Sequence, residues 1–185
     1  MTTNPTDEDV IALLLRQHNE IRQLFTTLET AKGDERRDDF RELVRLLAVH
    51  ETAEEEVTHP AARSGEGGQA IVDARLAEER EAKELLSRLD QLGPDGEGFD
   101  VLLAQLREAV LAHAEHEERE EFPRLQAAYD SEQLQTMAKA ARAAEAIAPT
   151  RPHPGIESPA ANLLVGPPAA IMDRARDLIR SALRR

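Results

Sequence analysis

The sequence contains no cysteine, no tryptophan, one tyrosine and four phenylalanines among its 185 residues. Without cysteine the chain has no disulfides, no thiolate metal site and no cysteine nucleophile. Aromatic and β-branched residues, which sheets prefer, are scarce, whereas the helix formers alanine, leucine, glutamate and arginine recur throughout. The composition therefore predicts an all-α protein.

Basic residues are also in short supply, with 23 Lys and Arg against 36 Asp and Glu and a net charge of −13 at pH 7. Binding to nucleic-acid phosphates needs a clustered basic surface, so the charge argues against a nucleic-acid partner. The early apolar run 11–15 is far too short to span a bilayer, and the start MTTNPTDEDV lacks the basic and apolar parts of a signal peptide. We expect a cytoplasmic protein with no membrane partner.

Four segments carry apolar residues at steps of three and four, the pattern of a helix with one buried face. Glycine-rich breaks such as SGEGG and GPDGEG separate them, and Pro60 is expected to end the second. Four helices of about 20 residues with short loops pack most simply as an up-down-up-down four-helix bundle, which we place at residues 1–128. The four segments cover residues 9–31, 40–57, 71–92 and 99–122.

Residues 129–185 form a different kind of segment, which we interpret as a C-terminal helical extension. SEQLQTMAKAARAAEAIA is helical in pattern, with Asp130 or Ser131 as its cap, and a proline-rich linker follows at 149–168. The last helix begins with prolines suited to a first helical turn. These additional helices would either pack on the bundle or provide the contact for a homodimer.

A histidine, a glutamate four residues later and a proline ten residues later occur together twice, as His50-Glu54-Pro60 and again in HAEHEEREEFP. The histidine and the glutamate share one helical face with the buried leucines. Burying such groups without compensation costs several kcal/mol each. Mutual pairing or a metal could compensate this cost.

The first and third helices offer further polar groups at comparable depth, His18 and Glu79. Imidazole with carboxylate and no thiolate suits iron, manganese or zinc, and carboxylates in a bundle can bridge two ions. His59, next to a proline, is assigned to a loop, and His116 to a supporting role behind a ligand. The set is too large for one tetrahedral zinc and suits two iron ions.

These residues resemble the hemerythrin-like (HHE cation-binding) domains, four-helix bundles that hold a non-haem di-iron centre. LLLRQHNEIRQLF is similar to the first-helix segment of that family, and HETAEEEVTHP and HAEHEEREEFP to its two histidine-x-x-x-glutamate segments. The match covers about residues 7–128. The resemblance implies two iron ions with oxo or carboxylate bridges, Glu54 and Glu117 being the carboxylates able to bridge. The implied ligands are His18, His50, Glu54, His113 and Glu117, with Glu51 at a position that some relatives also use.

The third helix departs from the family pattern, which has histidine in a segment like EEH before lysine and paired leucines. Here the chain reads EEREAKELL, which places Glu79 where the histidine is expected, with Glu78 as the alternative. A carboxylate is a harder, anionic ligand and should favour ferric over ferrous iron. With glutamate in place of histidine, we expect redox chemistry, sensing or iron handling rather than oxygen storage.

Three functions are compatible with the sequence. The first is a di-iron protein that binds dioxygen or hydrogen peroxide. The second is an enzyme with catalase-like or ferroxidase activity at the same centre. The third is a metal-free helical interaction module, in which the buried histidines form a hydrogen-bond network or a pH switch.

Overall fold

The computed structural model describes residues 8–64 and 66–146, and these ranges contain helices and no strands. The predicted all-α class is therefore confirmed. Two five-residue stretches, η1 and η2, are π-helical. The elements are α1 (Val10–Leu28), α2 (Gly33–Ala53), η1 (Glu54–Thr58), α3 (His59–Ala62), α4 (Gly68–Leu92), α5 (Phe99–His116), η2 (Glu117–Glu121), α6 (Phe122–Ala128) and α7 (Ser131–Glu145).

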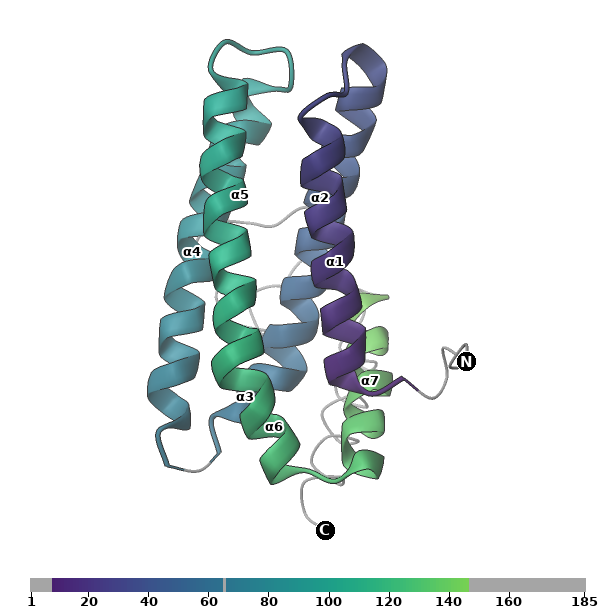
Figure 1. Cartoon of the computed structure of the whole chain (residues 1–185), viewed down its shortest axis with the longest axis vertical. Coiled ribbons are helices and arrows are strands. Elements are labelled where there is room, and N and C mark those ends of the chain that lie inside the picture. Colours follow the sequence, from purple (N-terminus) through teal and green to yellow (C-terminus); the bar gives the residue numbers. More distant parts are fainter. Residues whose placement is uncertain (1–7, 65, 147–185) are drawn as a thin grey trace, which may run out of the picture.

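The helices form four antiparallel rods, arranged as two hairpins that lie side by side (Figure 1). In one hairpin α1 packs on α2, and in the other α4 packs on α5. Two of the rods are composite, because α2 continues through η1 into α3 and α5 continues through η2 into α6. The predicted up-down-up-down bundle is confirmed.

Buried apolar residues form two clusters at opposite ends of the bundle. One cluster contains Phe25, Leu43 and Leu106, and the other contains Leu14 and Leu125. On each of the four rods the residues of one cluster precede a buried polar position and those of the other cluster follow it. The bundle therefore encloses a polar layer between two apolar layers.

The fifth long helix, α7, packs against α1 and α2 beside the bundle (Figure 1). It starts at a capping box in which the Asp130 side chain accepts from the Gln133 backbone while the Gln133 side chain accepts from the Asp130 backbone. This observation selects Asp130 from the two expected caps. The predicted linker at 149–168 and the last helix lie outside the described residues, so the proposed domain limits stay predictions.

The second and fourth rods do not end at their prolines. Pro60 was expected to end a helix, but it stands in the first turn of α3, and Pro123 stands in the first turn of α6. Proline is tolerated there because its missing N–H is not needed in a first turn. Each proline follows a π-helical stretch, closed by backbone N–H groups that donate to the carbonyl five residues earlier, from His59 to Glu54 and from Phe122 to Glu117.

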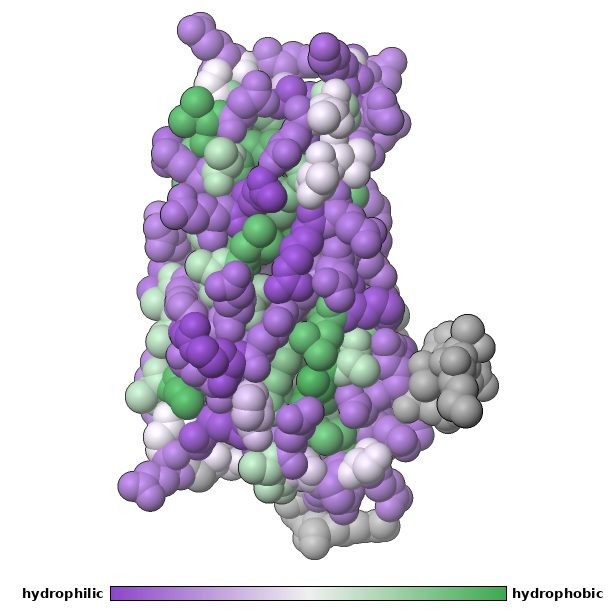
Figure 2. Space-filling view, in the orientation of Figure 1, coloured by the Kyte–Doolittle hydropathy of each residue, from purple (hydrophilic) through white to green (hydrophobic). Residues whose placement is uncertain are grey.

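Polar side chains cover most of the face in Figure 2, with small separate apolar patches between the helices. In the part of the chain that the structure describes, no helix is long and apolar enough to cross a membrane.

Candidate metal centre

The polar layer contains six of the seven side chains that the sequence nominates as metal ligands. Each is at most 8% exposed, and together they come from every rod of the bundle. The set is His18 on α1, His50 on α2, Glu54 at the start of η1, Glu79 on α4, His113 on α5 and Glu117 at the start of η2.

A first group of ligand atoms comes from His18, His50, Glu54 and Glu117, and all of these atoms lie within 4.8 Å of one another. The Nε2 atoms of His18 and His50 are 3.1 Å apart, and His18 Nε2 lies 3.3 Å from Glu117 Oε2. His50 Nε2 lies 3.1 Å from Glu54 Oε1. Ligand atoms about 2.0–2.2 Å from one ion, at right angles to each other, would be about 3 Å apart. The group therefore has the spacing of ligands around a single ion.

A second group comes from Glu54, Glu79 and His113, again within 4.8 Å of one another. Glu54 belongs to both groups. Glu117, from the first group, has its Oε1 atom 3.5 Å from His113 Nε2. Two carboxylates thus stand between the groups, in the position of bridging ligands.

Several of these buried atoms have no hydrogen-bond partner among the described residues. They are both carboxylate oxygens of Glu54 and of Glu117, Oε2 of Glu79 and Nε2 of His113. A buried polar atom without a partner costs about 1–3 kcal/mol, and more when it is charged. Cations at the centre would compensate for this cost, so the residues fit a metal centre.

Hydrogen bonds at Nδ1, on the side of each ring away from the centre, orient the histidines. In each ring Nδ1 faces an oxygen that can only accept, so Nδ1 carries the hydrogen and Nε2 of a neutral ring presents its lone pair to the centre. Two such lone pairs 3.1 Å apart, as in His18 and His50, repel each other unless a proton or a cation lies between them. The contacts made by Nδ1 are those of His18 with Glu118 (2.9 Å), His50 with Gln17 (2.9 Å) and His113 with Glu78 (3.0 Å).

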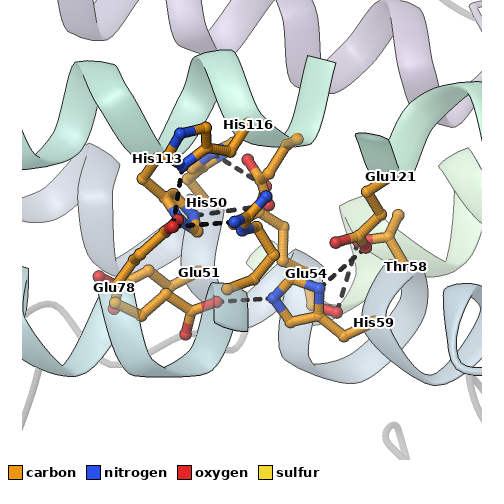
Figure 3. A network of polar contacts seen from close by, with 12 residues as sticks. His50, Glu51, Glu54, Thr58, His59, Glu78, His113, His116 and Glu121 are labelled. Atoms are coloured by element: carbon orange, nitrogen blue, oxygen red, sulfur yellow. Dashed lines mark hydrogen bonds and ion pairs between the residues drawn. The ribbon is translucent and has the colours of Figure 1, made fainter. Parts of the chain in front are cut away.

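Glu78, the alternative to Glu79, is one of these supporting residues. Its carboxylate accepts from Nδ1 of His113 and from Nδ1 of His116, and it pairs with Arg75 (Figure 3). His116 contacts the same carboxylate as His113, and neither Glu78 nor His116 belongs to the two ligand groups.

Glu51, the seventh nominated ligand, belongs to neither of these two groups. Its Oε2 atom lies 3.5 Å from Lys83 Nζ, which also contacts Glu55 at 2.7 Å and Glu79 at 3.5 Å. Glu51 nevertheless lines the cavity next to the centre.

His59 is the residue that sequence reasoning missed. It was assigned to a loop, but it lies in α3 and is 2% exposed. It contacts Glu121 (Figure 3) and also Glu79. In an uninterrupted α-helix, His59 would point about half a turn away from His50, nine residues earlier. The extra residue of η1 turns it inward. One signal in the sequence could have revealed the burial of His59. The repeated spacing aligns it with Phe122, an apolar residue that is also followed by proline.

The buried groups of the centre shift one another's pKa values in opposite directions. Burial raises the pKa of Glu54 well above its usual value, and the Glu117 carboxylate adds to the shift. Burial opposes ionisation of Glu117 too, but His113 and His18 hold its pKa below the ordinary value. Burial and the neighbouring His18 lower the pKa of His50. Metal ligands must be deprotonated, so binding of cations would release the protons that these groups share.

A small cavity adjoins the ligands, with about 20 Å³ of space for the centre of a water-sized molecule. One such molecule needs about 10–15 Å³. The cavity is lined by candidate ligands and by apolar side chains, including Ile21, Leu47, Ala82 and Val110. It has the size and lining for one small, weakly polar molecule.

Comparison with known proteins is consistent with this geometry. The family model described as Hemerythrin HHE cation binding domain matches residues 9–125. An uncharacterized hemerythrin-like protein of Schizosaccharomyces pombe is 24% identical over 170 residues, which cover 90% of this chain and 84% of that protein. A Nostoc protein named DNA nickase is 32% identical over 142 residues, 75% of this chain, but this chain spans only 38% of its length.

The fold also matches a solved structure. The crystal structure of a hemerythrin HHE cation-binding domain-containing protein from Mycobacterium kansasii superposes with a TM-score of 0.65 at 20% identity. The superposition covers 91% of this chain and 99% of that one, and at this identity it bears on the fold alone.

Proposed function

Because the chain belongs to the hemerythrin HHE cation-binding domain family, we propose that it holds two iron ions and binds dioxygen or a peroxide there. The observation that carries the proposal is the set of buried oxygen and nitrogen atoms that converge without hydrogen-bond partners in the described chain. One ion would be held by His18, His50, Glu54 and Glu117, and the other by Glu54, Glu79 and His113. Glu117 would act as a second bridge.

The donor set favours iron over zinc. It combines three imidazoles with three carboxylates and no thiolate, a mixture that non-haem iron accepts. Zinc in a structural site takes four tetrahedral ligands, and six converging side chains exceed that number. When bound, the iron pair supplies the electrons and an open position for a small oxygen ligand.

The chain's own residues would select that ligand by size and polarity. The cavity holds about one water-sized molecule. Its apolar wall, which includes Leu47 and Val110, offers no hydrogen-bonding groups to a bound water. The wall would exclude larger molecules and favour dioxygen over water.

A single methylene added to the cavity wall tests this assignment. Val110→Ile fills part of the space, so we expect unchanged iron content and about tenfold slower reaction of the ferrous protein with dioxygen, a barrier change of about 1.4 kcal/mol. Val101→Ile adds the same group on the same helix at a 66% exposed position and serves as the control. Equal rates for the two variants would reject the cavity as the ligand site.

The second candidate is catalytic peroxide breakdown or ferroxidase activity at the same centre. The observation in its favour is the Glu51 carboxylate in the cavity wall, next to Lys83. These polar groups beside the ligands are suited to proton exchange with a bound peroxide. Peroxide consumed per iron decides between the two functions. Many turnovers per centre that fall in Glu51→Gln at unchanged iron content would indicate an enzyme, and a single turnover would indicate binding.

The nickase activity named for the Nostoc relative is not part of this proposal. This chain spans 38% of that protein, and its own net charge of −13 does not favour contact with DNA phosphates.

A further inference from the structure

A second row of charged groups lies directly behind Glu79. His59 Nε2 lies 2.6 Å from Glu79 Oε1, and His59 Nδ1 lies 2.9 Å from Glu121 Oε1. All three side chains are buried, Glu121 completely. The order Glu121–His59–Glu79 thus joins the end of η2, the start of α3 and the middle of α4.

His59 is a donor in this row, because its Nε2 contact of 2.6 Å is shorter than the contacts of 3.1–3.5 Å at Nε2 of the three histidines of the centre. Carboxylate oxygens face both of its ring nitrogens, so both nitrogens carry hydrogens. His59, Glu117 and Glu121 do offer atoms close enough to surround an ion, but the ring nitrogens are already engaged. The contacts therefore make His59 a partner of Glu79 and not a third ligand site.

The hydrogen bond from His59 makes the two carboxylate oxygens of Glu79 inequivalent. Oε1 accepts from His59, whereas Oε2 has no hydrogen-bond partner within the described part of the chain and lies 3.5 Å from Lys83 Nζ. Only Oε2 is left for an ion shared with Glu54 and His113. Glu79 would bind that ion through one oxygen while the other accepts the hydrogen bond from His59.

We propose that His59, anchored by Glu121, is a positioning residue that holds Glu79 to one-oxygen coordination and weakens it as an anionic donor, thereby favouring ferrous iron. The inference rests on the proposed di-iron function and deepens it. A carboxylate whose second oxygen accepts a short hydrogen bond stabilises ferric iron less than a free carboxylate does, because the hydrogen bond withdraws electron density from it. The pair Glu79 and His59 would in this way offset the ferric preference expected from glutamate in place of histidine.

Removal of the hydrogen bond should shift the potential of the loaded protein. The double variant His59→Phe/Glu121→Leu removes both charges of the supporting pair, and phenylalanine already occupies the matching position, Phe122, in the other half of the repeat. We expect two irons per chain and an about tenfold rise in the ferric-to-ferrous ratio at fixed poise. That ratio corresponds to a midpoint about 59 mV lower for a one-electron couple.

Three single variants accompany the double one. Glu121→Gln keeps an acceptor of the same shape for His59 Nδ1 but removes its charge, so the midpoint should fall by a smaller amount, and this variant gives the readout if the double variant does not fold. His59→Gln retains an N–H donor for Glu79 and should restore part of the wild-type midpoint. Glu115→Gln, an exposed carboxylate on α5, is the control for charge alone.

Metal content by mass spectrometry is measured beside every potential. A wild type with two irons and a double variant with an unchanged or higher midpoint would overturn the positioning role and leave the di-iron function standing. A double variant that retains only one iron would also overturn it, because His59 would then be needed for binding. A wild type that takes up no iron would overturn the proposed function and this inference together.

Discussion

Substitution of Glu54 should make the metal-free protein more stable and the iron-loaded protein less stable. Glu54 is fully buried, and neither of its oxygens has a hydrogen-bond partner among residues 8–64 and 66–146. Such a group costs about 1–3 kcal/mol, and an apolar side chain of similar size avoids that cost. We therefore expect Glu54→Leu to raise the unfolding free energy of the metal-free protein by about 1–3 kcal/mol.

The stability gained in Glu54→Leu should depend on pH, whereas a gain from better packing alone would not. Burial raises the pKa of Glu54 well above 4.5 in the folded state, so the folded protein binds this proton more tightly than the unfolded chain does. The corresponding stability is present below the unfolded pKa and is lost as the pH rises towards the folded pKa. The advantage of Glu54→Leu should accordingly be larger at pH 8 than at pH 5.

Thermal unfolding with a chelator, at pH 5 and pH 8, measures both effects. For a chain of this size about 1 kcal/mol shifts the midpoint by roughly 2–4 °C, so an increase of about 2–12 °C is expected at pH 8. Iron should then raise the midpoint of the wild type and leave that of the variant unchanged. Glu115→Leu, at an exposed position, is the control. A variant that is less stable than the wild type without metal would refute the reasoning.

Three further substitutions test the individual roles. His113→Ala should remove most of the iron bound by the second group, whereas His116→Ala should retain it; equal loss in both would reject His113 as a ligand. Gln17→Leu removes the acceptor that orients His50 and should weaken iron binding by about 10–100-fold, measured by competition with a chelator, and unchanged affinity would contradict the role of that hydrogen bond. Glu79→His should slow oxidation of the ferrous form in air, and a rate equal to that of the wild type would mean that Glu79 is not a ligand.

Periodicity and polarity were enough to predict the bundle and the histidines at the middle of its buried faces. Apolar steps of three and four define one buried face on each helix, and His18, His50 and His113 interrupt those faces at one depth. Burial of one face follows directly from this periodicity, so the depth of the polar layer could be predicted from the sequence. The choice between Glu78 and Glu79 depends on the rotation of α4, and in the structure Glu78 contacts His113 and His116.

The helical distortions could not be read from the same periodicity. An α-helical period fails once a π-helical turn adds a residue, and the error then affects every position after Glu54. His59 was assigned to a loop because it precedes Pro60, and Glu121 on the other rod was not singled out. Pro60 was taken as a helix end because proline usually is one, although it follows a turn that leaves its missing N–H unneeded.

The central claim is that the converging histidines and glutamates hold two iron ions. Its most direct test is the metal content of the aerobically purified full chain by mass spectrometry, together with its optical spectrum. The account predicts about two irons per chain with near-ultraviolet absorption from oxygen-bridged ferric ions. No bound iron, and none retained after anaerobic loading with ferrous iron, would contradict it and return the buried histidines to a structural role.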